Sequence, residues 1–265
     1  LNGHDREPSW YRWSNKTEHI VIEEGITGVG SEAFAGFVKV LSVNIPHTVK
    51  KIKRSSFENN YRLREIQIPN EVNSIGDKAF AGCYGLKNLS LPSKLNYVGS
   101  FEFCRNIKSI SLPDSIKDTA DGMFTGCEML TSVKLPRKLK SIKSYDFADC
   151  RKLTKLNIPV TVKVVYMSAF AGSGLKKIVL PKSVQRIKNG NDGQKVFEYI
   201  KGVGYPTKNL RVIEIHSKKI KSIQKNSFSG LSSKVVIKVP KSKKKKYTKM
   251  LRKSGLSKKV KICNL

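Results

Sequence analysis

Long hydrophobic runs and acidic side chains are what this sequence lacks most. No apolar run reaches eighteen residues, so we expect no membrane-spanning helix. The residues after Leu1 are polar and aromatic, so we expect no signal peptide within the chain, and an export signal would lie outside it. Only 20 Asp and Glu oppose 51 Lys and Arg, which gives a formal charge of +31. Such a charge attracts polyanions, among them wall polymers, sulfated glycans, anionic lipids and nucleic acid, without selecting one.

Motifs for catalysis or cofactor binding are also missing. The sequence contains no phosphate-binding loop, HExxH or GxSxG pattern. Its four histidines have no Cys or carboxylate partner at a catalytic spacing, and we expect His47 and His216 to be solvent-facing turn residues. The glycines at 25, 28 and 30 do not follow the dinucleotide-binding pattern. We therefore expect no enzyme and no cofactor.

Three columns of residues recur with one period. Prolines that end a short apolar run are separated by 23, 23, 21, 23, 23 and 22 residues, at Pro46, Pro69, Pro92, Pro113, Pro136, Pro159 and Pro181. Phenylalanines keep the same period at Phe34, Phe57, Phe80, Phe101, Phe124, Phe147 and Phe170. A cysteine follows three residues after four of them, at Cys83, Cys104, Cys127 and Cys150. Three columns with one period indicate a repeat protein.

Each repeat unit predicts a short strand followed by a compact return. The alternation from Leu89 to Leu91 places two leucines inward and Ser90 outward, and Pro92 ends the strand because it has no N–H. The strands of stacked units lie about 4.8 Å apart, so nine units form a parallel sheet about 40 Å long. We therefore predict a right-handed repeat solenoid with one strand per unit and short helical or irregular returns.

Three regions are expected along this solenoid. Residues 1–19 form an aromatic N-terminal cap, residues 20–240 the repeats, and residues 241–265 a Lys-rich C-terminal cap, in which Tyr247 to Leu251 have helical spacing. His216 follows Pro181 by 35 positions, twelve more than one period. We place an insertion of loops near residues 188–209, with Phe197 retained in the core.

The repeat motif resembles the BspA-type bacterial leucine-rich repeat. The segment from Ile75 to Cys83, followed by Leu86, Leu89 and Leu91-Pro92, carries this resemblance, which extends over roughly residues 20–262. It implies a curved solenoid from a secreted or cell-wall-associated bacterial protein. Members are linked to adhesion, to binding of matrix or host proteins and to contact between cells. The resemblance supplies no catalytic residues.

The cysteine column allows three interpretations. The thiols recur once per unit, so they would lie in a line inside the stack as buried packing groups, which we favour. An occasional disulfide or a metal site are the alternatives, although zinc ligands normally come in closely spaced pairs. Cys263 is predicted to be a free thiol in a frayed end. The loop from Asn189 to Asp192 has only one carboxylate, so we expect no calcium site there.

Two surfaces are candidate binding sites. The first is the outward strand face, where repeated hydrogen bonds could hold a glycan or an extended peptide, although any solenoid needs solvated residues there. Its central column is Asn44, Gln67, Ser90, Ser111, Lys134 and Asn157, and the neighbouring column is Arg64, Lys87, Lys108, Thr131, Thr154 and Lys176. No aromatic platform for a sugar ring occurs in the central column.

The second candidate is the basic C-terminal end. The last fifty residues contain seventeen Lys or Arg and no acidic residue. This end is either a solvated cap or a contact for an anionic polymer. Its densest cations are Lys243, Lys244, Lys245, Lys246, Lys249, Arg252 and Lys253. Nucleic acid is not expected as the partner, because no recognition helix or aromatic stacking platform accompanies the charge.

These observations predict a non-catalytic, extracellular interaction module of the bacterial cell surface. Its repeat surface would bind a protein or glycan, and its basic end would contact an anionic cell-wall polymer. We expect a monomer. The alternative is a passive spacer within a larger surface protein.

Overall fold

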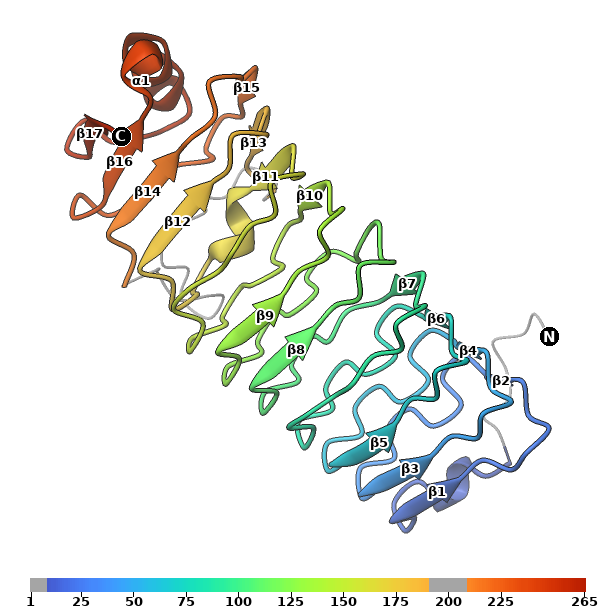
Figure 1. The fold of residues 1–265 in the computed structure, drawn as a ribbon. Helices are drawn as coiled ribbons and strands as arrows, with labels where there is room; N and C mark the ends of the chain where they lie inside the picture. The colour runs from blue at the N-terminus through green and yellow to red at the C-terminus, as the bar shows by residue number, and fades with distance from the viewer. Residues whose placement is uncertain (1–8, 191–208) are drawn as a thin grey trace.

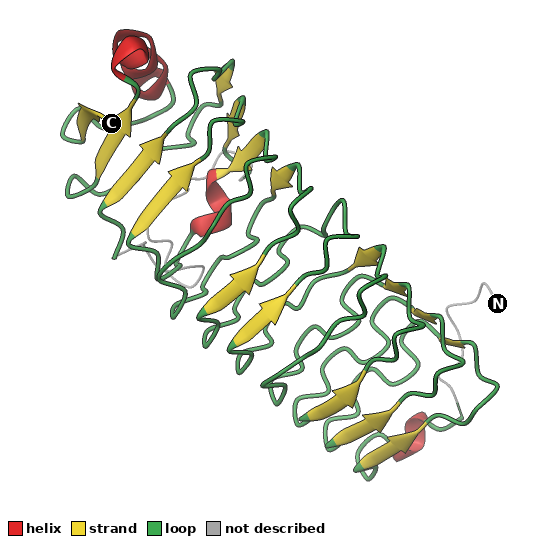
Figure 2. Ribbon diagram, viewed as in Figure 1, coloured by secondary structure: helices red, strands yellow, loops and turns green. Residues whose placement is uncertain are grey.

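The chain is an elongated solenoid. The computed structural model describes residues 9–190 and 209–265. Over these residues the backbone winds into about ten turns of about 23 residues each, with little helix (Figures 1 and 2). Strand β1 lies at one end, and helix α1 with strand β17 lies at the other (Figure 1). The predicted repeat solenoid is confirmed.

One side of the solenoid carries the predicted ladder of parallel strands. Its strands pair in three groups along the molecule, and the register joins equivalent positions of successive turns, such as Asn44 and Gln67. The first group is β1 (His19–Val21), β3 (Ser42–Asn44) and β5 (Glu65–Gln67), and the second is β8 (Ser109–Ser111) and β9 (Ser132–Lys134). The third is β12 (Lys177–Leu180), β14 (Val212–Ile215), β16 (Val236–Val239) and β17 (Lys261–Asn264).

The returns contain a second ladder of very short strands, which the sequence analysis did not predict. A turn follows the proline of each repeat, and the strands of this second ladder come after that turn. Each contains an inward-facing Val or Ile, such as Ile75 in the repeat of Pro69. Its first group is β2 (Gly28–Val29), β4 (Lys51–Ile52), β6 (Ser74–Ile75) and β7 (Tyr97–Val98). Its second group is β10 (Ser141–Ile142), β11 (Val164–Tyr166), β13 (Arg186–Lys188) and β15 (Ser222–Ile223).

The phenylalanine column forms the centre of the core. From Phe34 to Phe170 successive rings stack with centroids 5.6–6.4 Å apart. All rings from Phe57 onward in this stack are buried, and Phe228 is buried in a later turn. Since one turn cannot cover its own ring, the stack makes each turn depend on its neighbours. Phe197 lies outside the described residues.

The cysteine column lies beside this stack as predicted. Cys83, Cys104, Cys127 and Cys150 are free and buried. Each thiol donates a hydrogen bond to a phenylalanine carbonyl of the preceding turn at 3.1 Å, for example from Cys104 to Phe80. Burial raises the pKa of the Cys104 thiol to about 12, so the neutral form is favoured. These are packing thiols.

At the N-terminal end, aromatic side chains lie against the first turns. The 3-10 helix η1 (Tyr11–Trp13) follows Trp10, whose indole N–H donates to the carbonyl of Ala33 at 2.8 Å. The Trp10 ring lies 6.2 Å from that of Phe34. Trp13 is 53% exposed, so the aromatic segment covers the end of the core only in part.

At the C-terminal end, a helix and a final strand cover the core. After the 3-10 helix η3 (Lys241–Lys243), α1 (Lys244–Lys253) buries Tyr247 and Leu251, which confirms the helical spacing. Strand β17 then pairs with β16, so the sheet continues into the segment expected to form the cap. Cys263 lies in this strand opposite Lys238, and the predicted frayed end is therefore wrong, although the thiol is free.

The insertion leaves the strand ladder continuous. Strand β12 pairs directly with β14, with Ile178 opposite Ile213, across the extra residues between them. A 3-10 helix, η2 (Met167–Phe170), precedes β12. Most of the insertion, with Asp192 of the loop considered for calcium, lies outside the described residues. Within the described ranges no helix combines the length and apolar composition needed to cross a bilayer.

Candidate functional site

The structure brings the predicted strand-face residues together on one exposed surface. The central column lies on the outward side of the first ladder, and the cations beside it lie immediately before the strand positions. In the register, Asn44 lies beside Gln67 and Ser111 beside Lys134. The exposed residues are Asn44, Gln67, Ser90, Ser111, Lys134, Asn157, Arg64, Lys87 and Lys108.

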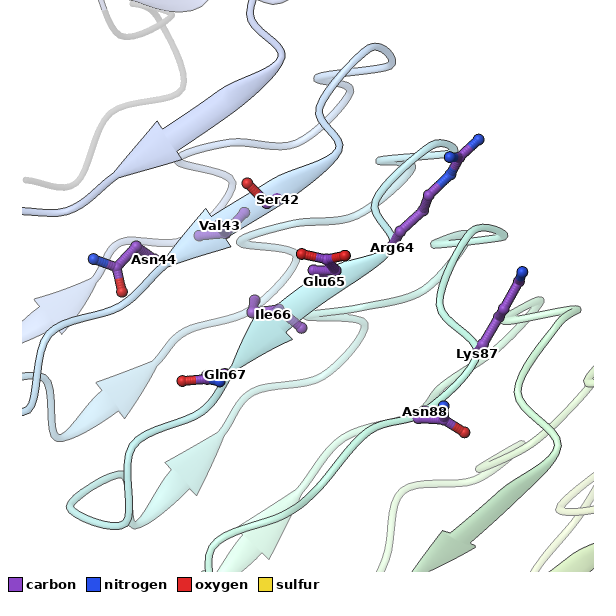
Figure 3. Close-up of a pocket in the computed structure, with 9 residues that line it drawn as sticks. All are labelled: Ser42, Val43, Asn44, Arg64, Glu65, Ile66, Gln67, Lys87 and Asn88. Atoms are coloured by element: carbon purple, nitrogen blue, oxygen red, sulfur yellow. The ribbon is translucent and has the colours of Figure 1, made fainter.

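A first hollow lies on this strand face over β3 and β5 (Figure 3). Arg64 and Lys87 extend along one rim, and Asn44 and Gln67 lie toward the ends of the strands (Figure 3). Glu65 lies between this rim and the strand ends (Figure 3). The surface therefore offers amide groups, two cations and the carboxylate of Glu65 to a ligand. The lining residues are Ser42, Val43, Asn44, Arg64, Glu65, Ile66, Gln67, Lys87 and Asn88.

A second hollow continues the first over β8 and β9 and shares Asn88 with it. Five of its eleven lining residues are serines, which have small hydroxyl side chains. Ser109 lies opposite Ser132 in the ladder, so hydroxyl groups recur from turn to turn. The lining residues are Asn88, Leu89, Ser90, Leu91, Ser93, Ser109, Ile110, Ser111, Pro113, Ser132 and Lys134.

Beyond these hollows the strand face carries a cluster of charged groups around Glu214. Its carboxylate lies 2.9 Å from the ammonium of Lys177 and 3.6 Å from that of Lys238, and 3.0 Å from Nε2 of His216. Burial raises the pKa of a carboxyl group, but hydrogen bonds from His216 and Lys177 outweigh it and hold the pKa of Glu214 below its usual value. His216 is thus a half-exposed partner of Glu214, which corrects its expected assignment as a solvent-facing turn residue. His47 does lie in an exposed turn, 3.0 Å from Glu24.

The basic end presents most of its predicted cations to solvent. Lys244, Lys245, Lys246, Lys249 and Lys253 of α1 are exposed, and Lys243 is partly so. The guanidinium of Arg252, in contrast, donates to the carbonyls of Ser257 and Val260, the latter at 2.9 Å. Arg252 therefore links the chain after α1 to the helix, and its role is structural.

The charge is distributed very unevenly along the solenoid. Residues 1–128 contain 16 basic and 15 acidic side chains, so this half is close to neutral. Residues 129–265 contain 35 basic and 5 acidic side chains, so nearly the whole excess lies here. The first hollow lies in the near-neutral half, and α1 lies at the far end of the cationic half.

A stack on the lateral edge was missed by the sequence analysis. The rings of Tyr61 and Tyr84 stack at 4.8 Å, and the guanidinium of Arg105 lies 4.6 Å from the Tyr84 centroid. Arg105 and Arg151 then approach the carboxylate of Glu128 at 3.8 and 3.5 Å. These residues follow the cysteine position in successive repeats, and that regular spacing was the available signal. Tyr84 lies between Tyr61 and Arg105, so it offers no free ring face to a sugar.

A third hollow lies on the second ladder and is acidic. Asp77, Glu102, Asp118 and Asp121 contribute to its lining. Its charges are partly compensated, since Lys143 lies 3.1 Å from Asp118 and the Tyr97 hydroxyl donates to Asp77. In the described ranges, no three His, Cys, Asp or Glu side chains are placed to hold a metal ion.

A buried carboxyl group lies behind this hollow. Asp146 is 3% exposed and accepts hydrogen bonds from the backbone N–H groups of Lys143, at 2.7 Å, and Met123, at 3.3 Å. Burial outweighs these bonds and raises the pKa of Asp146 to about 7. Asp146 is thus a pH-sensitive point in the core, immediately before Phe147.

Known structures share this architecture. A leucine-rich repeat protein from Bacteroides ovatus aligns with a TM-score of 0.62 and 27% identity, over 93% of this chain and 70% of that one. The leucine-rich repeat protein of T. pallidum aligns with a TM-score of 0.53 and 30% identity, over 57% of this chain and 73% of that one. A leucine-rich cell surface protein from Faecalibacterium prausnitzii shares the fold, with a TM-score of 0.50 and 20% identity over 94% of this chain and 65% of that one.

The sequence itself places the chain in a family. No curated protein sequence matches it. The BspA type leucine-rich repeat region, in contrast, matches in six copies over residues 7–103, 99–203 and 193–264. Proteins of this family and fold are generally non-enzymatic, and the repeats are consistent with a protein-interaction module. The chain belongs to the BspA-type leucine-rich repeat family.

Proposed function

We propose that this protein is a non-catalytic interaction module displayed outside the bacterial cell, which binds an extended ligand along its strand face. The ligand is a glycan or an extended protein segment. The observation that carries this proposal is the pair of adjoining hollows, lined by amide and hydroxyl groups that recur once per turn. An extended polymer with regularly spaced polar groups can form one hydrogen bond per turn there, because neighbouring strands lie about 4.8 Å apart.

An extended ligand suits this surface better than a folded domain. Protein interfaces usually centre on aromatic or Arg anchors in desolvated pockets. The central column from Asn44 to Asn157 contains only amide, hydroxyl and ammonium groups. Arg64 and Lys87 on the rim favour a ligand that carries some negative charge.

The proposal includes an extracellular, cell-surface location. The structural relative from Faecalibacterium prausnitzii is described as a cell surface protein. The basic end is the second part of the proposed function, a contact for an anionic polymer of the cell surface. One monomer would then reach a ligand with its strand face while its cationic end is held elsewhere.

Filling the second hollow tests the strand face. We expect Ser111→Trp to abolish binding to immobilised matrix proteins or glycans that the parent chain binds at physiological salt. Ser141→Trp on the second ladder is the matched control and should bind normally. Equal binding by the parent and both variants would reject the strand face as the binding surface. If the parent binds none of these proteins or glycans, the result would favour a passive spacer.

A further inference from the structure

The charged side chains of helix α1 are electrostatically unfavourable for the helix. The positive end of the helix macrodipole lies at the N-terminus, where acidic side chains are favourable. The first turn of α1 instead begins with Lys244, Lys245 and Lys246 and contains no acidic residue. Lys243 at the N-cap position makes no side-chain capping hydrogen bond. The sequence thus places cations where the backbone already carries positive charge.

Lys249 concentrates the repulsion along the helix. Residues three or four positions apart are neighbours on a helix surface, and like charges there are destabilising. Lys249 has four such cationic neighbours, namely Lys245, Lys246, Arg252 and Lys253. Glu214 is the last acidic residue in the sequence, and Lys177 and Lys238 already hold it. No side chain of residues 215–265 can offset this charge.

Docking of α1 directs these cations away from the molecule. Tyr247 and Leu251 are buried, and Tyr247 accepts a hydrogen bond from the backbone N–H of Ile220 at 3.0 Å. The opposite side of the helix therefore presents Lys245, Lys246, Lys249 and Lys253, all exposed. With a rise of 1.5 Å per residue, Lys245, Lys249 and Lys253 are spaced by about 6 Å along the axis. We name these four residues the lysine stripe.

We propose that the lysine stripe is a binding site for a linear phosphate-bearing polymer without bases. This proposal rests on the proposed function in one respect, namely that the basic end has an anionic partner. It adds the residues that form the site and the chemistry of the ligand. A row of ammonium groups matches a linear polyanion, whose charges relieve the repulsion around Lys249 and the unfavourable dipole at the start of α1.

The choice of cation and the lack of aromatics define the partner. The stripe is entirely lysine, which binds phosphate as a compact point charge, whereas Arg suits planar, bidentate recognition. Tyr247, the aromatic residue of α1, faces the core, so the stripe has no platform on which bases could stack. Recognition therefore depends on the charge and spacing of the polymer.

Lys249→Glu tests this site because it separates stability from binding. It replaces four repulsive pairs with attractive ones, so we expect a higher Tm without ligand. We also expect at least a tenfold weaker affinity for poly(glycerol phosphate) in low-salt titration. For the parent chain, log K should fall with log salt with a slope of about −3 if four lysines neutralise phosphates. Lys163→Glu, exposed beside β11, has the same net charge and is the control.

Each other outcome is informative. Equal loss of affinity in Lys163→Glu and Lys249→Glu would show that overall charge acts rather than the stripe. A lower Tm with unchanged binding would make the lysines structural. Tighter binding to duplex DNA or poly-glutamate than to poly(glycerol phosphate), at equal charge concentration, would overturn the assignment of the polymer. Ser111→Trp should leave polymer binding unchanged, so the stripe and the strand face can fail separately.

Discussion

The hydroxyl of Tyr247 in α1 accepts a hydrogen bond from the backbone N–H of Ile220 at 3.0 Å. Ile220 is buried two residues before β15, so this bond joins the helix to the last turns of the solenoid. It also provides a partner for an N–H that water does not reach.

Tyr247→Phe tests this attachment. The substitution keeps the ring but leaves the N–H of Ile220 without a partner, which costs about 1–3 kcal/mol for a buried group. We expect a lower midpoint in urea unfolding. Tyr61→Phe, at a 40% exposed position, is the control and should leave the midpoint unchanged. Equal midpoints for the parent and Tyr247→Phe would mean that water replaces the lost hydroxyl.

The phenylalanine stack should show a graded dependence on position. Phe124→Ala removes a fully buried ring between two stacked neighbours and is expected to destabilise by about 3–5 kcal/mol. Phe34→Ala, at the partly covered end of the stack, should cost less. Urea unfolding followed by circular dichroism measures both, and a larger loss at Phe34 would contradict the graded stack.

Two glycines at the same repeat position should respond differently to a methyl group. A Cβ at Gly76 would lie 2.5 Å from the backbone N of Arg54 and 2.6 Å from the carbonyl carbon of Lys53. We expect Gly76→Ala to destabilise by about 1–3 kcal/mol, as in other overpacked sites. At Gly30 the nearest atom lies 3.9 Å away, so Gly30→Ala should be tolerated. Thermal unfolding of the two variants provides the comparison.

Asp146 should make stability depend on pH. Its folded-state pKa of about 7 lies above that of an unfolded carboxyl group, so the native protein holds its proton more tightly. Stability should therefore fall as pH rises from about 4 to about 7 and then level off. Asp146→Asn removes this titration, and the difference in Tm between the variant and the parent should grow over that range. A difference that does not change with pH would show that Asp146 ionises normally.

Thiol chemistry should distinguish the two kinds of cysteine. The buried column is protected, whereas Cys263 in β17 is only partly covered. We expect about one of the five thiols to react with a disulfide reagent in the native protein and all five in denaturant. A Cys263→Ser variant should react only after unfolding. Rapid reaction of several native thiols would contradict the packed column.

The sequence predicts the solenoid because its signals recur. Pro, Phe and Cys repeat in register, so each turn strengthens the assignment of the next. The second ladder was missed because strands such as Ser74–Ile75 are too short to show alternation. Strand β17 was missed because it has no following proline and lies in a Lys-rich segment.

The candidate site was predictable in position but not in shape. Alternation around Ser90 and Ser111 gave the outward face, whereas the hollows depend on the size of neighbouring side chains across several turns. The contact of Glu214 with Lys177 could not be found from spacing, because the insertion lies between them, whereas Lys238 follows Glu214 by 24 residues, about one period. Phe197 and the rest of that insertion stay predictions.

The breaks in the two ladders are offset and overlap only between the turns of β7 and β8, where the bridge between Asn88 and Ser109 joins the two turns. The first ladder is interrupted between β5 and β8 and again between β9 and β12, whereas the second is interrupted between β7 and β10. Strands β6 and β7 pair beside the first break, β10 and β11 beside the second, and β8 and β9 beside the third. Most gaps in one ladder therefore lie beside paired strands of the other ladder. A pull along the solenoid that separates two turns at a break in one ladder therefore meets paired strands in the other ladder, except between the turns of β7 and β8, where it meets the bridge between Asn88 and Ser109.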